Sequence, residues 1–214
     1  MSVVDRLASS QGLRTQEANS AVALECTARP ELIPDIVGGL TAGSNLLAGD
    51  CAEVMTKVAE TRPDLVAPHA EALCALLGHT NGRVRWESAH ALALIAPFVP
   101  EVIERELDAF RKIISADKSV IIRDYIIDAV GAYGRSERDA AERAFPILRE
   151  TLAAWEGKHA ARTLVALGRL AATHPALGGE VAGLARDFLT HARPGIRKAA
   201  RAALKSAESA RKTT

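Results

Sequence analysis

The feature that most constrains how this sequence can fold is a column of apolar residues that recurs at nearly constant intervals. Its members are separated by 33, 37, 38, 37 and 37 residues, and they are Val22, Met55, Leu92, Val130, Leu167 and Leu204. A second column follows the first four of these steps and comprises Pro30, Pro63, Pro100, Arg138 and Pro175. Two columns in register indicate a chain built from repeats of one structural unit.

The pattern within each repeat predicts two helices. Apolar or small residues recur three, four, seven and eight positions from the first column, which is the spacing of one face of an α-helix. Proline suits a first helical turn because its missing N–H has no intrahelical partner there, and polar breakers such as residues 78–82 separate the two helices. One pair cannot bury its own apolar stripe, so successive pairs must stack. The chain is therefore predicted to be all-α, without strands.

A polar turn followed by Val-Arg or Ile-Arg opens three of the predicted second helices, at Arg85, Arg123 and Arg197. These dipeptides, in helices rich in Ala and Leu, resemble the HEAT repeats of the armadillo-like superfamily over residues 15–209. The resemblance implies an α-solenoid, a right-handed superhelix of about five antiparallel helix pairs of 37–38 residues with a terminal helix. It also implies a ladder of Asp–Arg pairs, for which Asp117 stands six residues before Arg123.

The repeats predict one domain over residues 1–214. Its units are expected at about residues 15–43, 44–80, 81–117, 118–155 and 156–192, with a terminal helix at 193–210.

The resemblance implies that second helices line the concave side of the solenoid, so their non-core residues form the candidate surface. Trp86 and His90 lie four apart and hence on one helical face. Acidic residues stand at matching positions one repeat earlier, at Asp50 and Glu53. Trp, Tyr and Arg are common interface anchors, and the residues predicted to bind a partner are Arg85, Trp86, His90, Arg123, Asp124, Tyr125 and Asp128. The alternative is an ordinary, partly exposed helix face whose Trp covers a neighbour's side chains.

Charge is unevenly distributed along the chain. Residues 1–75 hold ten Asp or Glu and five Lys or Arg, whereas residues 156–214 hold four and eleven. The predicted terminal helix concentrates the basic residues, which include Arg193, Arg197, Lys198, Arg201 and Lys205. Three interpretations remain open for this helix: a solvated cap of the array, a site for an acidic protein, or a site for nucleic-acid phosphate.

Little in the sequence points to catalysis. No His-Glu dipeptide repeats on successive helices, and the Gly-Gly pairs lack the Lys-Ser/Thr of a phosphate loop. Three cysteines without paired spacing favour a reducing compartment, and no apolar run approaches the length that spans a bilayer. We therefore expect a cytoplasmic protein that is not an enzyme, with no metal, no cofactor and no membrane association.

The sequence thus predicts a scaffold or adaptor that binds a protein or peptide partner on the concave face. The alternative is a nucleic-acid-binding protein similar to the HEAT-like DNA alkylation-repair glycosylases, which use aromatic residues and an Asp in a basic groove. This chain departs from them because His90, not Asp, stands four residues after Trp86. The sequence leaves the oligomeric state open.

Overall fold

The computed structural model describes residues 2–212, and every regular element in that range is a helix. The chain divides into two compact units, Met1–Val102 and Ile103–Thr214, which are treated separately below as the N-terminal unit and the C-terminal unit. None of the helices in the described range is both long and apolar enough to cross a membrane.

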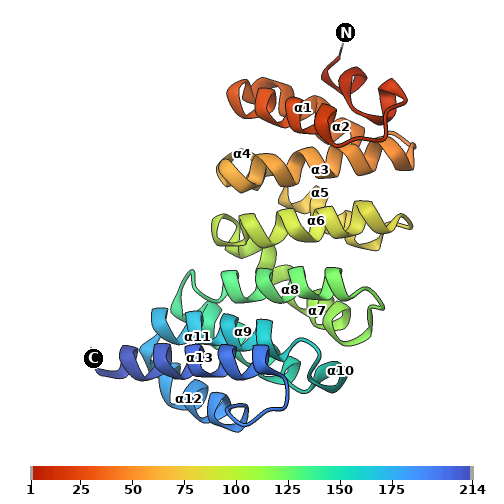
Figure 1. Cartoon of the computed structure of the whole chain (residues 1–214). Coiled ribbons are helices and arrows are strands. Elements are labelled where there is room, and N and C mark those ends of the chain that lie inside the picture. Colours follow the sequence, from red (N-terminus) through yellow and green to blue (C-terminus); the bar gives the residue numbers. More distant parts are fainter. Residues whose placement is uncertain (1, 213–214) are drawn as a thin grey trace. The chain divides into compact units, whose positions relative to one another are not determined.

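In the N-terminal unit, α3 packs between α1 on one side and α6 on the other (Figure 1). The shorter helices α2, α4 and α5 pack against α3 and α6. The bounds of these helices are α1 (Glu17–Ala28), α2 (Ile33–Gly39), α3 (Asn45–Thr61), α4 (Pro63–Val66), α5 (Ala70–Ala75) and α6 (Gly82–Ile95).

Proline explains why α4 and α5, between α3 and α6, are short. Pro68 lies between α4 and α5, where the chain forms a 3-10 turn over Ala67–His69 instead of continuing as one α-helix. Proline removes a backbone donor and clashes with the preceding turn, so an α-helix breaks there. The long second helices α3 and α6 contain no proline.

In the C-terminal unit, α8, α11 and α13 stack in that order, with α9 and α12 packed against them (Figure 1). The helices of this unit are α7 (Pro100–Ala116), whose first turn holds the boundary between the units, α8 (Val120–Tyr133), α9 (Arg138–Thr151), α10 (Ala154–Gly157), α11 (Ala160–Thr173), α12 (Gly178–Asp187) and α13 (Pro194–Lys212).

Small residues set the close spacing of α8, α11 and α13. A Cβ atom placed on Gly131 of α8 would lie 2.8 Å from the Cβ of Ala166 of α11. A Cβ on Gly168 of α11 would lie 2.8 Å from the Cα of Ala203 of α13. Both distances are shorter than van der Waals contact, so neither glycine position has room for a side chain.

The apolar column found in the sequence forms the core of the helix stack. Val22, Met55, Leu92, Val130 and Leu167 are buried, while Leu204 on α13 is half-buried. These residues come from the second helices of successive repeats, as the spacing predicts. The boundaries of the repeat units themselves stay a prediction.

The polar turns before the second helices share one hydrogen-bonding pattern. The arginine of each Val-Arg or Ile-Arg dipeptide donates to a backbone carbonyl before the turn: Arg85 to Leu77 (2.7 Å), Arg123 to Asp117, and Arg197 to His191 (2.8 Å). In each turn another side chain accepts a hydrogen bond from the backbone N–H two residues later in the chain. The accepting residues and the donor–acceptor distances are His79 (3.0 Å), Asp117 (2.8 Å) and His191 (3.1 Å). Histidine therefore substitutes for Asp in two of these turns. Arg123 contacts Asp117 at its backbone carbonyl, and the side-chain pairing of the expected ladder stays a prediction.

Candidate functional site

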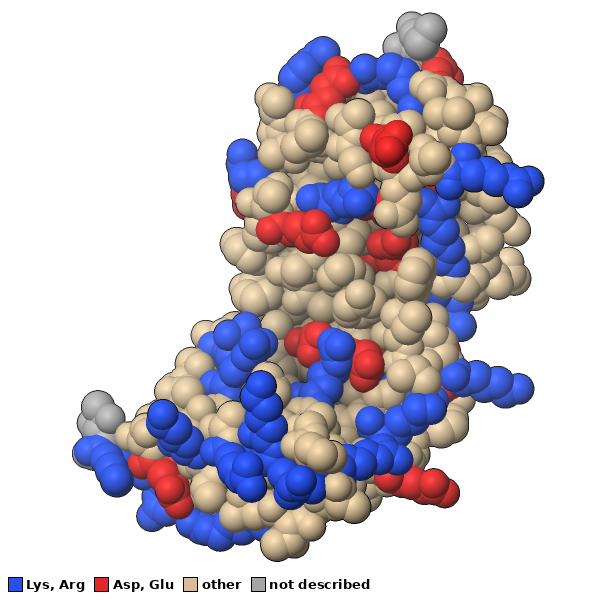
Figure 2. Space-filling view, in the orientation of Figure 1, with Lys and Arg blue, Asp and Glu red and all other residues tan. Residues whose placement is uncertain are grey.

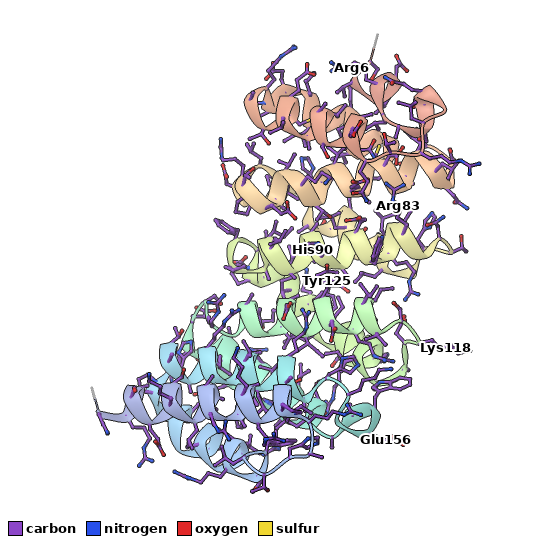
Figure 3. The ribbon with its side chains drawn as sticks, in the orientation of Figure 1. Arg6, Arg83, His90, Lys118, Tyr125 and Glu156 are labelled. Atoms are coloured by element: carbon purple, nitrogen blue, oxygen red, sulfur yellow. The ribbon has the colours of Figure 1, made fainter. Side chains whose placement is uncertain are left out.

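The first candidate surface lies on α6 in the N-terminal unit and consists of Arg85, Trp86 and His90, called here the α6 patch. All three are half-buried, and His90 is labelled in Figure 3. The Trp86 indole Nε1 has no hydrogen-bond acceptor among residues 2–212. A buried indole N–H usually has an acceptor, so Trp86 carries an unused donor.

Glu87 stands beside Trp86 on the same helix. Burial raises the pKa of this carboxyl above its usual value, although hydrogen bonding to Thr56 opposes the shift. Because Glu87 is only half-buried, the cost of ionising it is reduced by the remaining solvent.

Asp50 and Glu53, expected on the same surface one repeat earlier, are instead buried, each with 2% exposure. The N-terminal segment, with 3-10 turns at Val3–Arg6 and Ser9–Gln11, explains this difference because the Ser9 backbone N–H donates to Asp50 Oδ2 at 2.7 Å. Asn19 donates to Asp50 at 2.9 Å and to Glu53 at 2.8 Å. Arg83, labelled in Figure 3, forms ion pairs with both carboxylates. We call these residues the Asp50 cluster.

The pKa of Asp50 reports the balance in this cluster. Burial alone raises it, but the hydrogen bonds from Ser9 and Asn19 and the charge of Arg83 outweigh burial and hold the pKa below its usual value. The carboxylate is thus kept ionised inside the unit. A pocket of about 530 Å³ adjoins the cluster and is lined in part by Leu13, Arg14 and Leu46.

The second candidate surface lies in the C-terminal unit and combines Asp124, Tyr125 and Asp128 of α8 with Arg162 of α11. We call it the α8 patch. Arg162 forms an ion pair with Asp128, and its Nε lies 3.5 Å from Asp124 Oδ1. Its guanidinium carbon lies 6.0 Å from the centre of the Tyr125 ring. The arrangement joins an aromatic ring and three charged groups, all of them partly accessible to solvent.

Arg162 is the member of this patch that the sequence prediction missed. It stands 37 residues after Tyr125, so the repeat spacing already placed it on the adjacent helix beside that ring. Desolvation raises the pKa of Asp128, while the charge of Arg162 opposes the shift. The patch therefore sets one guanidinium against two carboxylates, those of Asp124 and Asp128.

Arg123 was expected to contact a partner, and the structure corrects this because its side chain is only 1% exposed. Its Nε donates to His159 Nε2 at 2.9 Å, and its guanidinium carbon lies 3.8 Å from the centre of the Trp155 ring. Since a guanidinium only donates, His159 Nε2 must accept, and the ring hydrogen is on Nδ1, 2.7 Å from Asp124 Oδ1. Arg123 thus supports the α8 patch from beneath, through His159 and Asp124.

Trp155 occupies an unusual turn between α9 and α11. Its φ is 52° and that of Glu156 is 56°, so two consecutive residues other than glycine adopt the left-handed conformation. The indole Nε1 donates to the carbonyl of Ile114 at 2.8 Å. Trp155 covers Arg123 while remaining 40% exposed.

The basic residues of the last repeat have different roles in the structure. Arg197 is half-buried and donates to the carbonyls of His191 and Ala192, both at 2.8 Å, so it belongs to the turn. Arg193, Lys198, Arg201 and Lys205 are exposed. Figure 2 shows many Lys and Arg side chains over the C-terminal unit.

The described residues hold no cluster of metal ligands, and their two fully buried thiols have raised pKa values. Within residues 2–212, no three His, Cys, Asp or Glu side chains are grouped as metal ligands would be. Burial raises the pKa of Cys26 to about 11 and that of Cys51 to about 12, and Cys74 is half-buried. Both fully buried thiols are therefore poor nucleophiles near neutral pH.

No protein-family model matches this chain, and no curated protein matches its sequence. Solved structures match over nearly the whole length. One engineered protein has 17% identity and a TM-score of 0.67, covering 98% of each chain. A computationally designed armadillo repeat protein for modular peptide recognition has 16% identity and a TM-score of 0.63, covering 95% of this chain and 98% of its own.

A third structure is a designed armadillo repeat protein in complex with the peptide (KR)4. It has 18% identity and a TM-score of 0.65, covering 95% of this chain and 97% of its own. Together these likenesses show the fold. The chain is an armadillo/HEAT-like α-solenoid, which confirms the all-α repeat architecture predicted from the sequence.

Proposed function

We propose that this chain is a non-enzymatic scaffold or adaptor that binds a protein or peptide partner through partly exposed side chains of its second helices. The contacts come from the α6 patch in the N-terminal unit and from the α8 patch in the C-terminal unit. Arg123 is not among them, because it is buried. The proposal includes the cytoplasmic location that the cysteine content favours.

The observation that carries this proposal is the organisation of the α8 patch. Arg162 is held by Asp128 and Asp124 beside the Tyr125 ring, while Asp124 is fixed from below by His159. Side chains already held in place lose little conformational entropy when a partner arrives. Tyr and Arg are also the residue types that most often contribute binding energy at the centre of an interface.

The α6 patch supports the same function by a different property. The Trp86 indole offers a large, half-buried apolar ring, while its N–H is buried and has no acceptor among residues 2–212. A partner would cover the accessible part of the ring. The described second helices thus provide one aromatic anchor in each unit.

The structural likenesses support a peptide as one form of partner. Of the similar solved proteins, one was designed for modular peptide recognition and another is in complex with (KR)4. A basic peptide would have to compete with Arg162 for Asp124 and Asp128 on the α8 patch. The sequence of the partner peptide is therefore to be identified by selection from a peptide library.

The test starts with selecting peptides from a displayed random library on the intact chain and measuring their affinity by fluorescence anisotropy. A peptide that binds the α8 patch should bind Tyr125→Ala at least tenfold more weakly, and a peptide that binds the α6 patch should bind Trp86→Ala at least tenfold more weakly. Tenfold corresponds to about 1.4 kcal/mol. Leu24→Ala and Phe98→Ala are matched controls, because both remove exposed apolar side chains outside the patches. Thermal melts establish that every variant is folded.

The proposal is wrong if both aromatic variants bind the selected peptides as tightly as the original chain does. It is also wrong if binding depends only on the basic residues of α13, because that result moves the working surface away from the second-helix patches.

Nucleic-acid binding is the alternative, and the basic excess of residues 156–214 favours it. Affinity for an oligonucleotide should then fall linearly with the logarithm of salt concentration, with a slope set by the phosphates neutralised. A DNA-glycosylase-like activity is tested by release of an alkylated base from duplex DNA. Tight, salt-dependent oligonucleotide binding without peptide binding would favour this alternative.

A further inference from the structure

The outer face of α13 differs from the corresponding faces of α8 and α11 at one repeated position. Gly131, Gly168 and Lys205 are 37 residues apart in turn. The two glycines allow the next helix to approach so closely that a Cβ atom would lie 2.8 Å from Ala166 or Ala203. Lys205, at the same position on α13, is exposed.

A lysine at this position changes what can pack there. A further repeat in the same register would have to approach as closely as α11 approaches α8, and the Lys205 stem occupies that space. The same obstacle opposes a second copy of the chain stacked onto α13 as another repeat. A protein that covers this face must stand further away and must accommodate an ammonium group.

Two apolar side chains nevertheless line a pocket on this face of α13. Leu189 and Leu204 line a pocket of about 480 Å³ together with Arg201, Lys205 and Lys212. Leu204 belongs to the column whose other members are buried in the core, and Leu189 stands 37 residues after the buried Leu152. Both leucines thus stand where earlier repeats bury an apolar side chain. We call these five residues the α13 face.

The charged residues around these two leucines are mostly basic. Glu208 also lines the pocket, but Arg186 pairs with it at 3.0 Å. Within residues 2–212, Arg201, Lys205 and Lys212 form no ion pair. They are separated by four and seven residues, so they follow one side of α13 over about 16 Å at 1.5 Å per residue.

We propose that the α13 face docks an acidic amphipathic helix of a protein partner. Its apolar residues cover Leu189 and Leu204, and its carboxylates pair with Arg201, Lys205 and Lys212. A helix matches the surface because α13 presents its cations at helical spacing, and a carboxylate-bearing helix repeats at the same 5.4 Å pitch. A phosphate backbone would satisfy the three cations but would leave both leucines uncovered. This surface is separate from the α6 and α8 patches.

The probe is a fluorescein-labelled peptide of about 20 residues, long enough to form several helical turns, with Leu at heptad positions a and d and Glu on the flanking positions. A matched peptide keeps every Glu and replaces each Leu by Ala, which preserves charge and helical propensity. We expect the Leu peptide to bind the full chain at least tenfold more tightly than the Ala peptide. Equal affinity for the two peptides, or no binding of the Leu peptide, overturns the proposal.

Protein variants then locate the site. The double variant Arg201→Glu, Lys205→Glu should weaken binding of the Leu peptide at least tenfold. The control is Arg111→Glu, Lys118→Glu, which makes the same change in net charge on exposed residues of α7 and of the connection to α8. An equal effect of both double variants would show that only overall charge matters, and the proposal would fail.

Nucleic acid is the competing ligand. A single-stranded and a duplex oligonucleotide are titrated in parallel at three salt concentrations. If either binds more tightly than the Leu peptide at each salt concentration, and Arg201→Glu, Lys205→Glu removes that binding, the face is a phosphate site and the helix-docking proposal is wrong. Because these measurements do not use the α6 or α8 patch, their outcome is independent of the function proposed above.

Discussion

The guanidinium carbon of Arg123 lies 3.8 Å from the centre of the Trp155 ring, at the turn that joins α9 to α11. Trp155 also donates from its indole to the Ile114 carbonyl. We expect Trp155→Ala to lower the free energy of unfolding by about 1–3 kcal/mol, the sum of a cation–π contact and a hydrogen bond. Urea unfolding followed by circular dichroism measures the effect.

The variant Trp155→Phe separates the two contributions. Phenylalanine retains an aromatic ring for Arg123 but has no donor for Ile114, so it should lose less than half of what Trp155→Ala loses. If the two variants are equally unstable, the contact between Arg123 and the ring contributes nothing.

Gly168 should not tolerate even a methyl group. A Cβ atom there would meet the Ala203 backbone at 2.8 Å, and overpacking of this kind typically costs about 1–3 kcal/mol. Gly183 in α12 is the matched control, because a Cβ atom there meets nothing within 4 Å and alanine is the better helix former by about 1 kcal/mol. We therefore expect opposite shifts in melting temperature from Gly168→Ala and Gly183→Ala. Shifts of the same sign would contradict the close packing of α11 and α13.

The Asp50 cluster depends on Arg83. The substitution Arg83→Met leaves the buried carboxylate of Asp50 without its cation and leaves Glu53 with Lys57 alone, at 3.5 Å, and breaking a buried pair typically costs about 3–5 kcal/mol. The matched control is Arg62→Met, which breaks only the exposed pair with Asp64 and should cost at most about 1 kcal/mol. Equal losses of unfolding free energy in the two variants would mean that the buried ion pairs of Arg83 contribute no more than the exposed pair of Arg62.

The pH dependence of the same cluster has a definite sign. The folded state holds the pKa of Asp50 below its ordinary value, so the stability from this group is present above the unfolded pKa, about 3.9, and is lost as pH falls through the folded one. In Arg83→Met the charge of Arg83 no longer lowers the pKa of Asp50, so less stability should be lost on acidification than in the original chain. Unfolding free energies measured at a series of pH values distinguish the two slopes.

The thiols should differ in reactivity. Burial raises the pKa of Cys26 and Cys51, so at neutral pH iodoacetamide should modify Cys74 first in the folded chain and all three after unfolding in urea. Intact mass and peptide mapping report the sites. Rapid modification of Cys51 in the folded chain would contradict its burial.

The raised thiol pKa values also predict weaker stability in alkali. The folded thiols stay protonated up to about 11 and about 12, whereas unfolded thiols ionise near 8.5. Stability from these groups is therefore full below the unfolded value and is lost as pH rises toward the folded values. Replacing Cys26 by Ala should flatten this decline.

The repeat columns predicted the fold well because burial in a helix stack imposes one period on every repeat. The sequence could not reveal that Asp50 and Glu53 are buried, because one contact to Asp50, from the Ser9 backbone N–H, comes from a segment that precedes the first repeat. The other contacts, from Asn19 and Arg83, depend on side-chain geometry. Tertiary contacts from outside a repeat leave no periodic signal in it.

The candidate surface shows two further limits of the sequence. Arg123 was predicted both to belong to the turn ladder and to contact a partner. A side chain that is buried at the turn cannot also contact a partner. Arg162 was not predicted although it stands 37 residues after Tyr125, because the repeat spacing places it on the adjacent helix without fixing the direction of its side chain. Its pairing with Asp128 depends on side-chain geometry.

The two glycine contacts differ in how the sequence could change over time. At Gly131 the opposing atom is the Cβ of Ala166, so an alanine at 131 could be offset by a glycine at 166, and the small and large partners could exchange places. At Gly168 the nearest atom is the Cα of Ala203, which no substitution removes. One helix contact is thus open to compensated drift, while the other confines its position to glycine for as long as the helices keep their spacing.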